Sequence, residues 1–315
     1  MATLYVVTGE QYRTIDRRMR EIKRQLDQDG GSPLDPEWVA RELQRIIEGK
    51  LEALPEDWLE TILTQERKAH LDFFGQEFDL ASFRDVLEKY GPQAIITGWH
   101  DLGLEVHFLP PVVMSQDAKF NDWKVKPENW YYQKVAEGKV CRRQPDGSLL
   151  PDTEAFKLEG ITVLVDTRLK PQYQEDKQMF KNDNLLGPII ERLRQEGKIA
   201  RYDYGPQSSR FGVSADEWEK EIKPALAEFL GVEVSQVRLE RTIEGNVIPQ
   251  LYPHMPRKDD GKTNTWVWYE EFFEGASRRL YGGYSEYGGL SGVNVGWVEN
   301  HWSGQALRPL VVLGA

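Results

Sequence analysis

The sequence contains one cysteine, Cys141, among its 315 residues. A single cysteine excludes an internal disulfide and a structural zinc site held by several thiolates. Cys141 is followed by Arg142 and Arg143, whose positive charge favours a somewhat lowered thiol pKa. A redox or catalytic role could follow from such a pKa, but a packing role is the simpler interpretation and the one we adopt.

The sequence also lacks a long apolar run. No stretch reaches the roughly 20 consecutive apolar residues that a membrane-spanning helix needs. The first residues, MATLYVVTGEQYRTID, do not have the basic-then-apolar layout of a secretion signal. We therefore expect a protein without a membrane partner that resides in the cytoplasm of its host, and the same features fit a viral and a cellular protein equally well.

Basic residues are in the minority, because 40 Lys and Arg stand against 51 Asp and Glu, a formal net charge of -11 at pH 7. Nucleic-acid binding depends on Lys and Arg clustered on one face, so this balance argues against a nucleic-acid partner. One segment is basic, with charges at Arg13, Arg17, Arg18, Arg20, Lys23 and Arg24. It could contact an acidic partner, but a solvated helix face is the interpretation that we prefer.

Residues 1–92 have the pattern of a helical module. Apolar side chains recur at alternating steps of three and four along the first helix, at Tyr12, Ile15, Met19, Ile22 and Leu26. A second helix over 35–49 is marked by an aspartate cap, a first-turn proline and a closing glycine. Weaker helical patterns cover 55–66 and 81–91. The apolar seam of the first helix packs either within this module or in a homo-oligomer formed through the N-terminal helices.

From residue 93 the pattern changes to short apolar runs separated by glycine and proline, which is typical of strands and loops. We assign 93–157 to a connecting region. The β-branched run 161–165 predicts a buried strand, and 182–198 predicts a helix. Together with the helical first module, these elements predict an α+β protein.

The segment 214–231 predicts a further helix, which begins with Ser214 and Glu217 in capping-box spacing and stops at a glycine. Pro224 should interrupt it, because proline lacks the backbone N–H that a helix uses. Its buried side should consist of Trp218, Ile222, Leu226 and Phe229.

Four motifs then follow in a fixed order. They are the helix 214–231 leading into RLERTIE at 238–244, NTWVWYEEFFEG at 264–275, RRLYGG at 278–283 and QALRPLVVL at 305–313. In this order they resemble the central helix and turn, the tryptophan segment, the glycine turn and the last strand of the C-type-lectin-like fold of formylglycine-generating enzymes. The chain departs from that pattern at Glu240, where the family prefers proline, and at Val267, where it has glutamate.

The resemblance implies a C-type-lectin-like ligand-binding domain over 158–315, after the helical module and the connecting region. Its scaffold would include Arg238, Leu239, Trp266, Trp268, Gly282, Gly283 and Arg308. Formylglycine-generating enzymes hold copper with cysteines, and this half of the chain has none, so that oxygen-activating chemistry is excluded. The sequence is closer to the variable proteins of diversity-generating retroelements, whose diversified segment lies at the C-terminal end of the same fold.

The segment from Tyr281 to Trp302 has the composition of a binding surface, with Tyr, Trp, Ser, Asn and His between glycines. Tyr and Trp supply contact area at low entropy cost, while Ser, Gly and Asn adapt their hydrogen bonds. In the variable proteins, mutation at adenines favours several of these residue types. The resemblance therefore implies an exposed surface made of Tyr281, Tyr284, Ser285, Tyr287, Ser291, Asn294, Asn300, His301 and Trp302. Trp297 could belong to the surface or to the scaffold, and aromatics near glycine can also simply pack a loop-rich fold.

We therefore expect a ligand-binding or display protein, not an enzyme, that uses no cofactor and whose unknown ligand is a protein. An enzyme of another class is the main alternative, because His100, Asp101 and His107 could supply metal ligands or a base. Their spacing matches no metal motif, and His254 has no visible partner in the sequence, so we expect no metal site. A structural role, such as a virion or assembly component, is a second alternative. The calcium-binding sequences of sugar-binding C-type lectins do not occur.

Overall fold

The computed structural model of the protein describes residues 9–26, 36, 39–40, 43, 57–168, 172–174, 177–180, 183–255, 266–283 and 290–314. The chain divides into two units, 1–56 and 57–315. Helices and antiparallel strands together make up the structure, so the chain is an α+β protein, as the sequence predicted. Within the described ranges, no helix has both the length and the apolarity needed to cross a bilayer.

The first unit contains α1 (Gly9–Leu26), which confirms the helix predicted from the apolar seam. Along that seam Met19, Ile22 and Leu26 are half-buried and Ile15 is exposed. The basic side chains that the structure describes in α1 are all exposed: Arg18, Arg20, Lys23 and Arg24. The side chains of Tyr12, Arg13 and Arg17, and most of the helix predicted over 35–49, lie outside the described residues.

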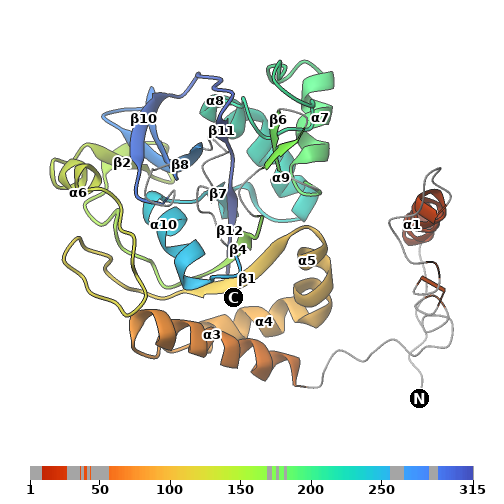
Figure 1. Ribbon diagram of the computed structural model, residues 1–315, viewed down its shortest axis with the longest axis horizontal. Coiled ribbons are helices and arrows are strands. Elements are labelled where there is room, and N and C mark those ends of the chain that lie inside the picture. Colours follow the sequence, from red (N-terminus) through yellow and green to blue (C-terminus); the bar gives the residue numbers. More distant parts are fainter. Residues whose placement is uncertain are drawn as a thin grey trace. The chain divides into compact units, whose positions relative to one another are not determined.

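The second unit begins with α3 (Trp58–Phe74) and α4 (Ala81–Pro92), which lie side by side (Figure 1). They confirm the helices predicted over 55–66 and 81–91, and α3 continues beyond its predicted end. A π-helical segment, η1 (Gln93–Gly98), and the short α5 (Trp99–Asp101) then lead into the first strand.

A four-stranded antiparallel sheet forms the centre of this unit. Its order is β1 (Leu104–Leu109), β4 (Ile161–Asp166), β12 (Pro309–Leu313) and β7 (Val237–Leu239). The strand predicted over 161–165 is thus β4, and the C-terminal strand lies between β4 and β7. Alternate residues of a strand face opposite sides of the sheet, so one face of this sheet packs against α3 and α10 and the other against the core that includes α4 and α9.

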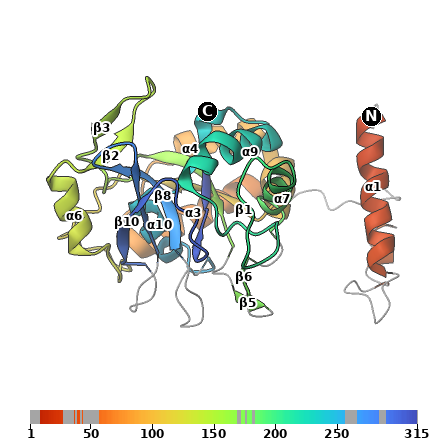
Figure 2. The same ribbon diagram turned by 90° about the horizontal axis from the view of Figure 1, so that it is seen from above.

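A second sheet has the order β10 (Val293–Trp297), β9 (Arg278–Gly282), β8 (Trp266–Phe273), β2 (Val140–Arg143) and β3 (Leu149–Pro151), with antiparallel neighbours. The short β11 (Gln305–Ala306) adds to β8 in parallel. A separate hairpin joins β5 (Gln172–Gln174) to β6 (Lys177–Met179). Figures 1 and 2 both place β2, with α6 (Asn129–Ala136), at one end of the unit and α7 (Gly187–Gln195) at the other, and Figure 2 shows β3 beside β2.

The helix predicted over 214–231 is present in three parts: α8 (Ala215–Glu217), the π-helical η2 (Trp218–Ile222) and α9 (Lys223–Leu230). The Ser214 and Glu217 capping box forms as predicted. The widened turn of η2 precedes Pro224, which confirms the predicted interruption. Trp218, Ile222 and Leu226 are buried, but Phe229 is 49% exposed, so its predicted burial is wrong.

Helix α7 occupies the middle of the segment predicted over 182–198. A 3₁₀ turn, η3 (Val234–Gln236), leads into β7, and α10 (Thr242–Leu251) follows β7.

The sequence had indicated that residues 93–157 form a connecting region. The structure differs, because these residues supply β1 to one sheet and β2 and β3 to the other. The boundary expected at residue 92 is also absent, since α3 and α4 belong to the unit 57–315.

Cys141 lies on β2 and is buried. Burial raises the pKa of its thiol, whose Sγ contacts the Lys139 carbonyl oxygen at 3.7 Å. The lowered pKa expected from the two arginines is therefore wrong. Both guanidinium groups are engaged elsewhere: that of Arg142 pairs with Glu159, and that of Arg143 lies over the ring of Phe272.

Candidate functional site

The RLERTIE turn fixes the start of α10. Arg238 on β7 donates from two guanidinium nitrogens to both carboxylate oxygens of Glu244, at 2.6 and 2.7 Å. Glu244 also accepts from the backbone N–H of Arg241 at 2.8 Å, which caps the helix. Burial alone would raise the pKa of Glu244, but the Arg238 charge outweighs it and lowers that pKa. A two-point ion pair of this kind sets the direction in which α10 leaves the sheet.

A group of aromatic rings surrounds Tyr281 of β9. Trp268 is fully buried, and its indole N–H donates to the Val213 carbonyl oxygen at 3.1 Å. Tyr281 meets the rings of Trp266, Trp268 and Trp302 edge-to-face, with centroids 5.1, 5.8 and 5.1 Å away. Such contacts stabilise by about 0.5–1.5 kcal/mol each beyond the burial of area. Tyr281 is therefore a packing residue.

The expected exposure of Tyr281 is wrong, because its side chain is only 5% exposed. Tyr281 is paired with Trp268 of β8, so the two side chains lie on the same face of the sheet, where the surrounding indole rings cover the Tyr281 ring. Tyr284, Ser285 and Tyr287 lie outside the described residues.

The other residues predicted for the surface lie at or near it. Asn294, His301 and Trp302 are exposed, the last at 40%, while Ser291 and Asn300 are half-buried. His301 pairs through Nε2 with Glu217 at 2.9 Å. Trp297 is 52% exposed and lies beside the guanidinium of Arg278.

Among the residues predicted to form the scaffold, five are buried: Arg238, Leu239, Trp268, Gly282 and Arg308. Trp266 and Gly283 are half-buried. Gly282 has a steric reason, because a Cβ atom there would lie 2.7 Å from the Tyr269 ring and even closer to the Gly292 carbonyl oxygen. Arg308 donates from Nη1 to the carbonyl oxygen of Arg168 at 2.7 Å.

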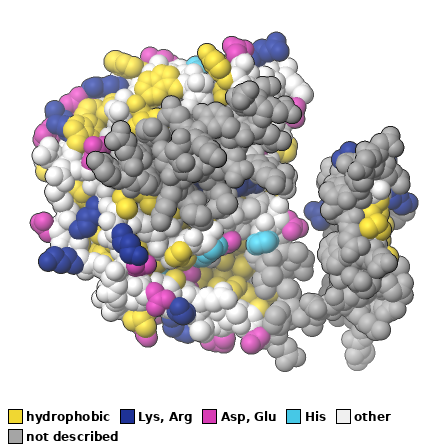
Figure 3. Space-filling model, in the orientation of Figure 1, with side chains coloured by type: hydrophobic (Ala, Val, Ile, Leu, Met, Phe, Trp, Pro, Cys, Tyr) yellow, Lys and Arg dark blue, Asp and Glu magenta, His cyan; other side chains and the backbone are white. Residues whose placement is uncertain are grey.

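A pocket of about 560 Å³ lies elsewhere, between α3, β1 and the turn after α10. Its polar lining includes Glu66, Glu105, His107 and His254, with apolar walls such as Ile62 and Leu251. Figure 3 shows histidine side chains next to acidic and hydrophobic ones at the surface of this unit. A pocket with apolar walls and a few convergent polar groups is the usual form of a ligand site.

Local structure explains how these groups meet. Glu105 and His107 are two residues apart on the edge strand β1, so their side chains lie on the same face. Glu66 comes from α3, which packs on that face. The chain turns sharply after α10, where the Met255 N–H donates to the Tyr252 carbonyl oxygen at 2.9 Å, and this turn carries His254 to the rim.

Glu66 is held by several donors. One carboxylate oxygen accepts from the Phe108 backbone N–H at 2.8 Å and from the Tyr252 hydroxyl at 2.6 Å, and the other accepts from His107 Nδ1 at 3.1 Å. The His107 ring also stacks on the Tyr252 ring, with centroids 3.7 Å apart. The hydrogen bond to Glu66 and the stacking on Tyr252 together hold the His107 ring in one orientation.

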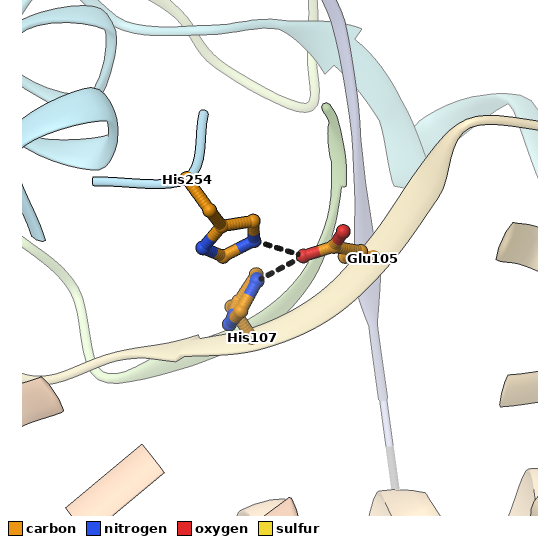
Figure 4. A group of neighbouring side chains, drawn as sticks. All are labelled: Glu105, His107 and His254. Atoms are coloured by element: carbon orange, nitrogen blue, oxygen red, sulfur yellow. Dashed lines mark hydrogen bonds and ion pairs between the residues drawn. The ribbon is translucent and has the colours of Figure 1, made fainter. Parts of the chain in front are cut away.

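Glu105 connects the two histidines (Figure 4). Its Oε2 accepts from His254 Nε2 at 2.7 Å and from His107 Nε2 at 3.3 Å. Burial alone would lower the pKa of His107, but the charges of Glu66 and Glu105 outweigh it and raise that pKa. Burial likewise acts to raise the pKa of Glu66, and the charge and hydrogen bond of His107 lower it instead. Glu66, His107 and Glu105 thus alternate in charge, and the hydrogen bond between Glu105 and His254 continues this series of contacts to the rim.

The sequence directed attention to His100, Asp101 and His107 as neighbours in the chain. The structure brings His107 together with Glu105 and the distant His254, while His100 lines the same pocket and Asp101 does not. One signal in the sequence does point to the pair on β1, because a Glu-x-His spacing on a predicted strand puts both side chains on one face. Glu66 and His254 carry no such signal, since they join the site through tertiary packing.

Comparison with known proteins adds no assignment, because the chain matches no family model, no curated protein and no solved structure.

Proposed function

We propose that the chain is a ligand-binding protein whose C-terminal surface, defined as Asn294, Asn300, His301 and Trp302, binds a protein partner. The proposal includes the resemblance to variable proteins of diversity-generating retroelements, with a C-type-lectin-like domain that uses neither calcium nor cysteine. A location in the host cytoplasm is part of the same proposal.

The observation that carries the proposal is the packing of Trp302. Its side chain is 40% exposed, yet its ring meets the buried Tyr281 ring edge-to-face at 5.1 Å. A large aromatic side chain that packs against the core on one side and is exposed on the other loses little conformational entropy when a partner covers its exposed side. Exposed tryptophans of this kind are among the side chains that contribute most to binding at protein interfaces.

The neighbours of Trp302 support the same interpretation. Asn294 is exposed on β10, which pairs with β9 and lies at the end of the strand order of its sheet. His301 is also exposed and directly precedes Trp302 in the chain.

The genetic test is sequencing of the gene and its surroundings. We expect an adjacent reverse transcriptase and a near-copy of the 3′ end of the gene that differs mainly at adenines. Codons 284, 285, 287, 294, 300, 301 and 302 should vary between isolates. If both the reverse transcriptase and the near-copy are absent, the retroelement part of the proposal is wrong.

A protein-level test separates surface from scaffold. A variant with alanine at Asn294, Asn300, His301 and Trp302 together should lose about 2 kcal/mol or less of unfolding free energy, because exposed side chains contribute little to folding. Trp268→Ala should lose about 3–5 kcal/mol, because it removes a buried ring. If the fourfold variant fails to fold, these residues are packing residues and the binding surface is not where we place it.

A further inference from the structure

We infer that Glu105, His107 and His254 form a binding site for a divalent transition-metal cation, with Glu66 as the outer carboxylate that orients His107. The site lies in the pocket beside β1, and the residues of the C-terminal surface take no part in it. The inference is therefore independent of the function proposed above.

The first argument is the placement of the three ligand atoms. One ligand atom from each of Glu105, His107 and His254 lies within 4.8 Å of the other two. Ligand atoms around a tetrahedral Zn²⁺, at about 2.0–2.2 Å from the ion, are separated by about 3.3–3.5 Å. The distance from Glu105 Oε2 to His107 Nε2, 3.3 Å, already has this value.

The third ligand needs a small adjustment. Glu105 Oε2 and His254 Nε2 are 2.7 Å apart, so they must separate by about 0.6 Å to hold a tetrahedral ion between them. The side chain of His254 is 58% exposed and follows α10 in a turn at the rim. It can therefore turn outward without displacing any core residue.

The second argument is the contact behind His107. Metal-binding histidines almost always donate their other ring N–H to a carboxylate or carbonyl, which fixes the ring and its tautomer. Here His107 Nδ1 contacts Glu66 Oε2 at 3.1 Å, which directs Nε2 toward Glu105 and His254. Glu66 is itself fixed by the Phe108 N–H and the Tyr252 hydroxyl. The structure thus has the inner ligands and the outer support that such a site requires.

The donor set selects the kind of cation. Two imidazole nitrogens and one carboxylate oxygen suit Zn²⁺, Fe²⁺ and Co²⁺, whereas Ca²⁺ and Mg²⁺ prefer oxygen ligands alone. The two negative charges of Glu66 and Glu105 balance the charge of a divalent ion. The metal would replace the proton on His107 Nε2 that forms the hydrogen bond to Glu105. Three protein ligands leave at least one position of the ion open toward the 560 Å³ pocket.

Calorimetric titration of Zn²⁺ into the full-length, tag-free protein after chelator treatment tests the site, with the visible spectrum of bound Co²⁺ as a second readout. We expect one equivalent of metal per chain. Glu105→Gln and His254→Gln should each weaken binding by about tenfold or more, while Glu77→Gln, which alters an exposed carboxylate on the segment after α3, should bind as the wild type does. Thermal unfolding of each variant checks that it is folded.

A fourth variant, His301→Gln, tests the exposed histidine that pairs with Glu217 on the C-terminal surface. If His301→Gln abolishes binding and His254→Gln does not, the metal lies at that other pair and the inference is wrong. It is equally wrong if the wild type binds Zn²⁺ no better than Glu105→Gln does, because the four side chains are then only an ion-pair chain.

Discussion

Arg210 and Asp183 form a buried two-point ion pair, in which Nε and Nη2 of Arg210 each donate to one carboxylate oxygen at 2.6 Å. The third guanidinium nitrogen, Nη1, donates to Asp166 on β4 and to the Leu307 carbonyl oxygen just before β12. One side chain therefore joins the central sheet to the segments that precede α7 and β12.

Arg210→Met should lower the unfolding free energy by about 3–5 kcal/mol, because two buried carboxylates lose the guanidinium group nearest to them and keep the longer ion pairs with Arg168, at 3.4 Å from Asp183 and 3.3 Å from Asp166. Urea unfolding followed by tryptophan fluorescence measures the loss. Arg192→Met on α7 is the matched control, since that arginine is half-exposed and pairs with Glu196 at the surface. Equal stability of the two variants would show that the buried contact contributes nothing.

Glu271 should make the stability depend on pH near neutrality. Burial raises its pKa to about 7, against the partial opposing effect of the Arg241 charge and the Thr242 N–H. In the unfolded chain this carboxyl ionises near pH 4.5, so folding favours its protonated form. The stability due to this group is therefore present below pH 4.5 and is lost as the pH rises through about 7.

Glu271→Gln tests this, because the amide stays neutral and its oxygen can still accept from Thr242. We expect the variant to lose less stability than the wild type between pH 4.5 and 8, as measured by urea unfolding at several pH values, while the raised pKa of His107 contributes the same pH dependence to both proteins. Parallel curves for the two proteins would show that Glu271 does not titrate in this range.

Tyr252→Phe should remove about 1.5–3 kcal/mol of unfolding free energy, since the hydroxyl donates to the ionised Glu66 at 2.6 Å. The ring stacking on His107 is retained in this variant. Thermal and urea unfolding measure the change, and Tyr204→Phe, at a side chain that is 67% exposed, is the control. A loss no larger than that of the control would mean that Glu66 finds another donor.

Gly282→Ala should destabilise the second sheet by about 1–3 kcal/mol, because the added methyl group would lie 2.7 Å from the Tyr269 ring and closer still to the Gly292 carbonyl oxygen. Gly314→Ala has open space around it and should be neutral. Differential scanning calorimetry of both variants measures the effect. Equal melting temperatures would mean that the β9 and β10 pair relaxes at no cost.

The sequence alone determined the elements that depend on neighbours within a few residues. The seam of α1, the capping box at Ser214 and Glu217, the interruption before Pro224 and the strand β4 all follow from spacing along the chain. Local rules determine them because helix caps and strand alternation involve residues one to four positions apart.

Only the tertiary structure decided the order of the strands and the composition of the pocket. The C-terminal strand β12 lies between β4 and β7, and residues 93–157 contribute to both sheets, which no local pattern indicates. Tyr281 has the same residue type as an exposed binding residue, yet Trp268 and Trp302 enclose it. His254 and His107 are 147 positions apart in the sequence, yet their rings lie close together because α10 returns to the edge of the central sheet. Contacts over such separations depend on how whole elements pack, so the chain must fold before these side chains become neighbours.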